Sequence, residues 1–169
     1  MTSSNIVLAI TTTTTALIAG LLYGYACSVN LGLGKLPDNT YIAAMQFINR
    51  EIQNPVFFIS FMGTLILLPL STFMQFGQPM TTRFWLLAAA TLVYVVGVFG
   101  VTALGNVPLN NALDAFNLEN APAESIARQR IAFESSWNSL HKIRTIASVV
   151  ALVLVVLACL NPTSLEHQD

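Results

Sequence analysis

Charge is scarce in this chain, and the places where it is missing indicate the class of protein. Only 9% of the 169 residues are Asp, Glu, Lys or Arg, whereas about a quarter are charged in an average soluble domain. Four segments contain no charged residue, and each can house the roughly 20 apolar residues that cross a bilayer. The sequence therefore predicts a four-span integral membrane protein. The uncharged segments lie between Met1 and Lys35, Glu51 and Arg83, Arg83 and Asp114, and Arg144 and Glu166.

Basic residues, cysteines and histidines are also few. A net charge of −1 argues against nucleic acid as a partner. Cys27 and Cys159 lie inside predicted spans, so we expect small buried apolar side chains rather than a disulfide or a metal site. The two histidines, His141 and His167, are too few for an iron, copper or zinc site or for bis-histidine haem ligation. We expect no metal and find no evident cofactor signature.

The first apolar segment has no basic residue before it and no cleavage site after it. We therefore expect it to be a retained span rather than a cleaved signal peptide. The predicted fold is an all-α integral membrane protein of one domain, residues 1–169. It is a four-helix transmembrane bundle with an amphipathic helix between spans one and two and a long fourth helix. The expected spans are residues 6–31, 56–76, 84–104 and the membrane part of 123–160, and the amphipathic helix is 40–53.

Glycine, proline and three asparagines are crowded together after the third span. The run from Gly105 to Asn111 reads GNVPLNN, and Pro108 is expected to break the helix there. A non-helical break at membrane depth is tolerated only where it faces protein or a water-filled cavity. We therefore expect Asn106 and Asn110 to face the fourth helix and to form hydrogen bonds with it.

One polar stripe marks the fourth helix as the place where chemistry could occur. Glu134, Trp137 or Asn138, His141 and Arg144 recur at helical spacing and would share one face. Such a face is too costly to leave in lipid, so it must point inward or towards the membrane surface. His141 could exchange a proton near neutral pH.

Arg144 and the nearby amides could stabilise an oxyanion. The alternative is structural: Arg144 would reach the lipid phosphates, Trp137 would anchor at the interface, and the asparagines would cap helix ends. The polar side of the amphipathic helix could likewise be a solvated surface. The candidate catalytic residues are His141, Arg144, Asn106 and Asn110. The candidate substrate-binding residues are Trp137, Asn138, Glu134, Tyr94, Gln46 and Asn49.

Three runs of the sequence are similar to segments of a known family. They are YIAAMQFINREIQNP at residues 41–55, TALGNVPLNNAL at 102–113 and WNSLHKIRT at 137–145. On these runs the chain resembles the anthrone oxygenase-like family of small membrane proteins over nearly its whole length. The resemblance implies a four-span helical bundle. The positions that match the family pattern are Asn106, Pro108, Asn110, Trp137 and Arg144.

The fungal members of that family imply a function. They oxidise polyketide anthrones to anthraquinones with molecular oxygen and without a demanding cofactor. Many bacterial members are described only as a domain of unknown function, and they imply a place in the bacterial inner membrane. The leading hypothesis is a membrane oxygenase acting on a hydrophobic, aromatic anthrone- or quinone-like substrate by acid–base chemistry. The alternatives are a non-enzymatic module that binds a lipid, a quinone-like ligand or a partner protein, and then a transporter, for which a homo-oligomer could supply the missing repeat.

The distribution of basic residues predicts an orientation in the lipid bilayer. Basic residues near the spans favour the cytoplasmic side. Loops one and three carry six of the seven basic residues, so both tails are expected outside and these loops in the cytoplasm. The six are Lys35, Arg50, Arg128, Arg130, Lys142 and Arg144.

Overall fold

The fold consists of helices throughout the residues that the structure describes. The computed structural model describes residues 2–77 and 79–161, in which four helices are long and apolar enough to cross a membrane. The predicted four-span, all-α architecture is thereby confirmed. The first spanning helix comprises α1 (Ser3–Gly24), η1 (Tyr25–Val29) and α2 (Asn30–Leu33), and the second is α4 (Pro55–Phe73). The third comprises α5 (Thr82–Val93), η2 (Tyr94–Gly100), η3 (Thr102–Asn106) and α6 (Val107–Asp114), and the fourth is α7 (Ala123–Leu160).

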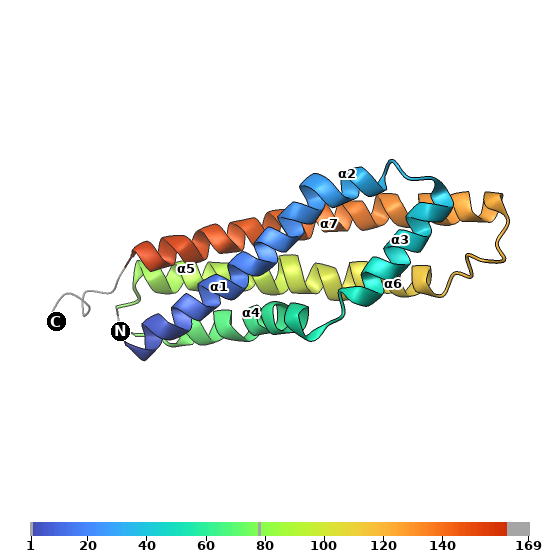
Figure 1. Cartoon of the computed structure of the whole chain (residues 1–169). Coiled ribbons are helices and arrows are strands. Elements are labelled where there is room, and N and C mark those ends of the chain that lie inside the picture. The colour runs from blue at the N-terminus through green and yellow to red at the C-terminus, as the bar shows by residue number, and fades with distance from the viewer. Residues whose placement is uncertain (1, 78, 162–169) are drawn as a thin grey trace.

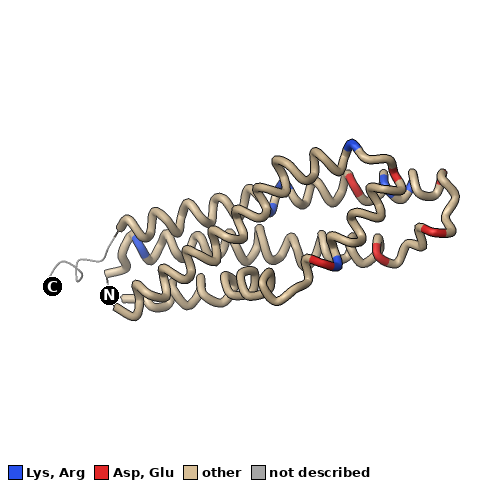
Figure 2. The backbone as a smooth tube through the Cα atoms, in the orientation of Figure 1, with Lys and Arg blue, Asp and Glu red and all other residues tan. Residues whose placement is uncertain are grey.

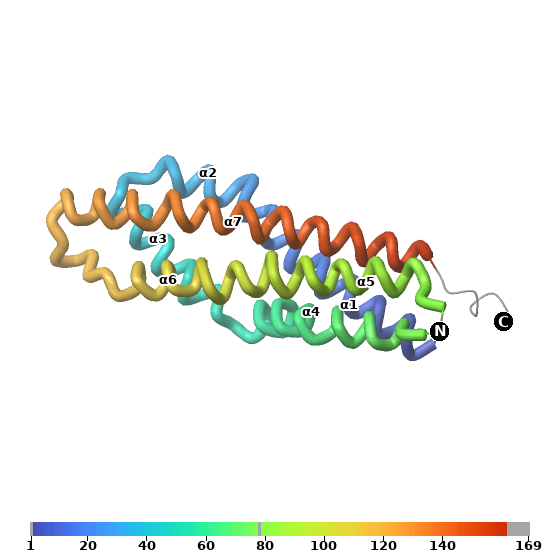
Figure 3. The backbone as a smooth tube through the Cα atoms, turned by 180° about the vertical axis from the view of Figure 1, so that it is seen from behind, coloured from blue at the N-terminus to red at the C-terminus, as the bar shows by residue number. Residues whose placement is uncertain are grey.

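The third and fourth helices form the long axis of the bundle. They run antiparallel and side by side, whereas α1 begins beside α4 and ends beside α7 (Figures 1 and 3). The two long helices approach each other closely at Gly97, where an added Cβ would lie 2.6 Å from the Cβ of Ala147. A side chain at this position would push η2 and α7 apart.

The amphipathic helix between spans one and two is α3 (Asp38–Glu51), as predicted. Its apolar face buries Tyr41, Ile42 and Met45 against α6 and α7, where Leu113 and Trp137 complete a small core. A second and larger core lies among the four spanning helices. Helix α3 lies along one end of the bundle, beside α6 and α7 (Figure 1).

The predicted break at Gly105–Asn111 is wrong, because the third helix continues through it to Asp114. Proline lacks an N–H group, and its ring clashes with the carbonyl four residues earlier in a regular α-helix. Here the π-helical turns η2 and η3 precede Pro108, which lies in the first turn of α6. The wider turns absorb the misfit, so the chain remains helical and the asparagines project from a continuous helix.

Apart from Arg83 in the first turn of α5, the described charged residues gather in the half of the bundle that contains α3 (Figure 2). Helix α4 spans 19 residues, or roughly 28 Å, close to the hydrocarbon thickness of a bilayer. Helix α4 is therefore long enough to cross a bilayer once. Cys27 and Cys159 are exposed on the outer face, so the prediction that they are buried is wrong.

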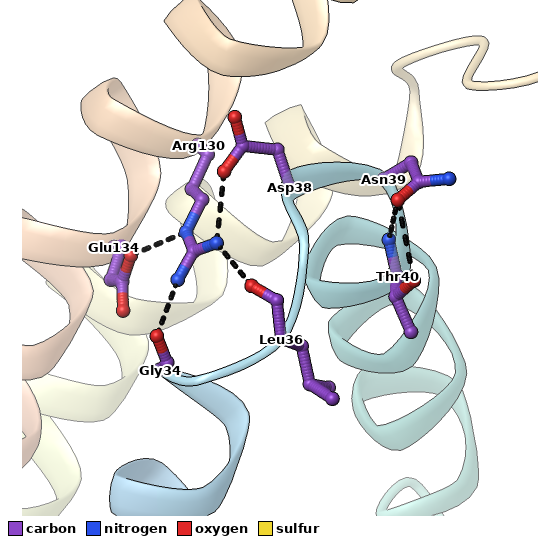
Figure 4. A network of polar contacts seen from close by, with 7 residues as sticks. All are labelled: Gly34, Leu36, Asp38, Asn39, Thr40, Arg130 and Glu134. Atoms are coloured by element: carbon purple, nitrogen blue, oxygen red, sulfur yellow. Dashed lines mark hydrogen bonds and ion pairs between the residues drawn. The ribbon is translucent and has the colours of Figure 1, made fainter.

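Arg130 joins the α2–α3 turn to α7 (Figure 4). Its Nε donates to Glu134 Oε2 at 2.8 Å, and its Nη1 donates to Asp38 Oδ1 at 2.9 Å and to the Leu36 carbonyl at 2.6 Å. Its Nη2 donates to the Gly34 carbonyl at 2.9 Å. A single guanidinium group thus fixes the start of α3 to the fourth helix.

The ring of Tyr41 lies beneath the same guanidinium, with 4.5 Å between Arg130 Cζ and the ring centroid. Burial raises the pKa of the Tyr41 phenol above its ordinary value, and the neighbouring Glu134 carboxylate raises it further. Tyr41 therefore stays neutral and offers Arg130 a ring face, which is a favourable surface for a cation.

Replacing Arg130 should loosen α3. Arg130→Met keeps the length of the side chain but leaves two carboxylates and two carbonyls without their donor, so the free energy of unfolding should fall by about 2–3 kcal/mol. The measurement is unfolding in detergent, followed by circular dichroism. The matched control is Arg128→Met, since Arg128 forms a solvent-exposed pair with Glu124 and should contribute less than about 0.5 kcal/mol. Equal effects of the two substitutions would contradict the role of Arg130.

Candidate functional site

A cavity of about 200 Å³ lies under α3, at the level of the first two turns of α4. Its apolar walls are aliphatic and aromatic side chains, including Leu22 of α1, Ile52 after α3, and Phe57 and Phe61 of α4. Leu21 and Phe58 also line it while being 42% and 43% exposed. Because these two side chains are partly exposed, the wall that α1 and α4 contribute reaches the outer surface of the bundle.

The predicted stripe of the fourth helix forms the polar wall of this cavity. Trp137, His141 and Arg144 all line it, at the spacing that places residues on one helical face. Trp137 and His141 are buried, and their rings stack with centroids 5.0 Å apart. The inward direction of the stripe is therefore confirmed, and Arg144 faces the cavity rather than the lipid headgroups.

Arg144 is held by side chains on both long helices. Its Nε donates to His141 Nδ1 at 3.1 Å, its Nη1 lies 3.5 Å from Thr102 Oγ1, and its Cζ is 5.1 Å from the Trp137 ring centroid. The position of Arg144 in the sequence predicts either a backbone carbonyl near Gly105–Pro108 or a bound anion or enol as its acceptor. The structure pairs Arg144 with the side chains of His141 and Thr102 instead of such a carbonyl, and the bound anion or enol stays a prediction. The remaining N–H groups of the guanidinium are available to a ligand.

The hydrogen bond from Arg144 fixes the tautomer of His141. Since Nδ1 accepts, the neutral ring carries its proton on Nε2, which lies 3.5 Å from Thr145 Oγ1. The basic lone pair of His141 is thus directed at Arg144. A proton can reach it only when Arg144 turns towards another acceptor.

Tyr25 completes the aromatic side of the cavity, although it is not among the candidate site residues that the sequence predicts. It lines the cavity, and its ring centroid is 5.2 Å from that of His141 and 5.5 Å from that of Trp137. Its hydroxyl contacts Met45 Sδ at 3.3 Å. Tyr25 begins the π-helical turn η1, and such turns are frequent at functional sites, but a single sequence does not reveal them.

The two predicted asparagines form hydrogen bonds with the fourth helix, as expected. Asn106 Nδ2 donates to the Trp137 carbonyl at 3.3 Å, and Trp137 Nε1 donates to Asn110 Oδ1 at 2.8 Å. Asn110 lines the cavity, whereas Asn106 is fully buried between the helices. Asn110 therefore orients the indole ring, and Asn106 acts in helix packing.

Four other predicted site residues lie outside the residues that line this cavity. Tyr94 is fully buried and donates to the Phe61 carbonyl. Glu134 is paired with Arg130, and Gln46 donates to the carbonyls of α6 and the turn after it. Asn138 is partly buried beside Trp137. Asn49, by contrast, does line the cavity.

Metal ligands do not come together in the described part of the chain. Within residues 2–77 and 79–161, no three His, Cys, Asp or Glu side chains are placed to hold one metal ion. Whether the protein uses a cofactor is untested, and a cofactor-free reaction stays a prediction.

A bundle of four helices that are long and apolar enough to cross a membrane defines a multi-pass membrane protein, and its cavity is lined by aromatic side chains and an arginine. Residues 56–154 match the anthrone oxygenase family. This is more than half of the chain, which therefore belongs to the anthrone oxygenase family, and an oxygenase-like kind of function follows. No curated protein and no solved structure matches the chain. The family match includes Trp137, His141 and Arg144 but not η1 and α3, which supply Tyr25 and Asn49 to the cavity.

Replacing Trp137 should show how much its hydrogen bond to Asn110 stabilises the packing of the two long helices. Trp137→Phe keeps an aromatic ring but removes the buried N–H that binds Asn110, so the free energy of unfolding should fall by about 1–2 kcal/mol. The measurement is denaturant unfolding in detergent. The control is Trp85→Phe, because Trp85 is 60% exposed and has no such bond. If both substitutions have the same effect, the indole bond does not stabilise the bundle.

Proposed function

We propose that this protein is a membrane oxygenase that oxidises a hydrophobic aromatic ketone, of anthrone or quinone type, with molecular oxygen. The observation that carries the proposal is the Arg144–His141 pair facing an aromatic cavity. A buried cation beside a neutral imidazole can bind a forming enolate and receive the proton that is released. The family to which the chain belongs supports oxygen chemistry of this kind.

The shape and chemistry of the cavity favour a flat aromatic substrate. A cavity of roughly 150 Å³ lined by apolar side chains holds benzene, so about 200 Å³ with an open side accommodates a larger ring system. Phe57, Phe61 and Tyr25 offer ring faces and edges to it. The substrate reaches this position from the bilayer, where a polycyclic ketone partitions.

Charge balance makes the first step favourable. Arg144 turns from His141 Nδ1 to the substrate oxygen, and the freed lone pair accepts a proton from the acidic methylene carbon. An anion and a second cation then form together, so the net charge of the buried site does not change. Without the enolate, two adjacent cations would repel each other in a poorly solvated position.

Oxygen enters the second step as the oxidant. The enolate carbon gives electrons to dioxygen and forms a bond to one oxygen atom, which becomes the new carbonyl. The other oxygen atom leaves as water with the two hydrogens of the methylene group. Methylene plus dioxygen thus gives ketone plus water, and the chain's own residues contribute binding, proton acceptance and anion stabilisation.

We also propose that the charged end of the bundle, with α3 and the cavity, faces the cytoplasm of a bacterial inner membrane. The support is the gathering of basic residues at this end (Figure 2), as the positive-inside rule requires. The start of α1 and the end of α7 would then face outward.

Substitutions of Arg144 and His141 should separate stabilisation of the enolate from acceptance of the proton. Arg144→Lys keeps the charge but loses the planar fork, and kcat/KM for anthrone should fall roughly tenfold to a hundredfold at every pH. His141→Gln should cost roughly a hundredfold near neutral pH, and the loss should shrink at high pH, where anthrone ionises in solution. The measurement is anthraquinone absorbance and oxygen uptake in proteoliposomes, with the spontaneous reaction subtracted.

Lys142→Gln is the control, because Lys142 is exposed on the same helix and its loss should leave the rate unchanged. A pH-independent loss in His141→Gln would make His141 a positioning residue for Arg144 instead of the base. If wild-type protein binds anthrone without accelerating its oxidation, the non-enzymatic binding module replaces the oxygenase.

Cysteine labelling tests the orientation. In a background where Cys27 and Cys159 are changed to alanine, Asn117→Cys between α6 and α7 should be protected from an impermeant reagent in intact cells. Thr81→Cys at the start of α5 should react. The reversed pattern would show that the charged end faces outward.

A further inference from the structure

The cavity has a second polar end that the proposed chemistry does not use. At this end Asn49 lines the wall and is only 7% exposed. Its side-chain amide makes no hydrogen bond to any of residues 2–77 and 79–161. Its polar atoms are not among the fully buried ones that lack a partner, so they are accessible from the cavity that the residue lines. The unpaired amide of Asn49 is therefore available to a ligand.

The surroundings of Asn49 are polar but uncharged. Gln53 lines the same part of the cavity and donates from Nε2 to the Asn49 carbonyl at 2.9 Å, so its own side-chain oxygen remains available. Asn110 accepts from Trp137 through Oδ1, and its NH₂ group makes no bond within the described chain. Amides with free donors and acceptors suit a hydroxyl or a carbonyl rather than an ion.

This amide-lined end is displaced from Arg144 along the third helix. Gln46 and Arg50, on either side of Asn49 in α3, bind residues 113–116 at the end of α6 and just after it. Thr102, the contact of Arg144, precedes Asn110 by eight residues, or roughly 12 Å along a helix. The Trp137 indole joins the two parts of the cavity, because its Nε1 donates to Asn110 Oδ1 and its ring centroid is 5.1 Å from Arg144 Cζ.

We infer that Asn49 is a specificity-determining residue, which binds a hydrogen-bonding oxygen at the end of the ligand remote from the group held by Arg144. The ligand class is a polycyclic aromatic ketone with a hydroxyl or carbonyl on its terminal ring. This inference rests on the proposed function, since it requires the ketone oxygen to lie at Arg144. It places the selection between similar ligands in α3, which is the one helix of the cavity wall that is not a predicted membrane span.

The other unpaired amides do not provide such a site. Asn106 Oδ1 and Asn138 Oδ1 are buried without a partner in the described chain. Neither residue lines the cavity, so a ligand in the cavity does not reach them. Asn49 alone of these three is both unpaired and open to the ligand chamber.

Two probes that differ by one hydroxyl test the inference. Anthraquinone and 2-hydroxyanthraquinone are titrated into protein in lipid nanodiscs, and binding is followed by quenching of Trp137 fluorescence in a Trp85→Phe background. The parent should bind the hydroxylated probe more tightly. Asn49→Leu should weaken binding of that probe roughly tenfold, the value of one well-made hydrogen bond, and leave anthraquinone binding unchanged.

Two further variants make the result specific. Asn39→Leu changes an exposed asparagine of the same helix and should preserve the preference. Arg144→Lys should weaken both probes equally, because it acts on the shared ketone. If both probes bind the parent and Asn49→Leu with the same relative affinity, Asn49 does not select the ligand, while the proposed function stands. If neither probe binds the parent, the proposed function itself fails and the inference falls with it.

Discussion

The structure depends on accommodating an arginine inside an apolar helix bundle. Arg144 begins the long uncharged part of α7, where an unpaired cation facing lipid would be costly. Contacts with His141 Nδ1, the hydroxyl of Thr102 and the ring of Trp137 offset the free-energy cost of burying this cation. These partners come from two antiparallel helices, so the cation also determines which faces of α5–α6 and α7 meet. A group that is costly to bury thereby becomes the centre of the site.

The second constraint is that α3 must pack over the bundle for the cavity to be enclosed. Four spanning helices alone would leave the polar wall of α7 open at the membrane boundary. Helix α3 closes it, fixed at its start by Arg130 and along its length by Gln46 and Arg50. The cover carries Asn49, so the element that closes the cavity also contributes to its chemistry. In the function proposed above, a hydrophobic ligand would enter from the lipid and its polar groups would meet amides and a guanidinium.

The errors of sequence interpretation have physical causes. Pro108 indicated a break because a regular α-helix cannot contain it without strain, yet π-helical turns before it absorb the misfit. Cys27 and Cys159 were expected to be buried because they lie in apolar segments, but lipid-facing and buried surfaces of a membrane helix are equally apolar. Tyr94 and Glu134 carry useful chemistry in principle, but their side chains are engaged in packing and in the Arg130 network.

The sequence by itself determined the four spans, α3 and the long fourth helix, because hydrophobic length and periodicity are local properties. It also determined that Trp137, His141 and Arg144 share one face, since helical spacing requires it. Only the tertiary structure decided which residues oppose that face. Tyr25, Asn49 and Thr102 meet it from three separate segments, through helix crossing angles and wide turns that no local pattern encodes. The site therefore forms where the helical face of Trp137, His141 and Arg144, which can be recognised in the sequence, packs against residues that only the tertiary structure brings close.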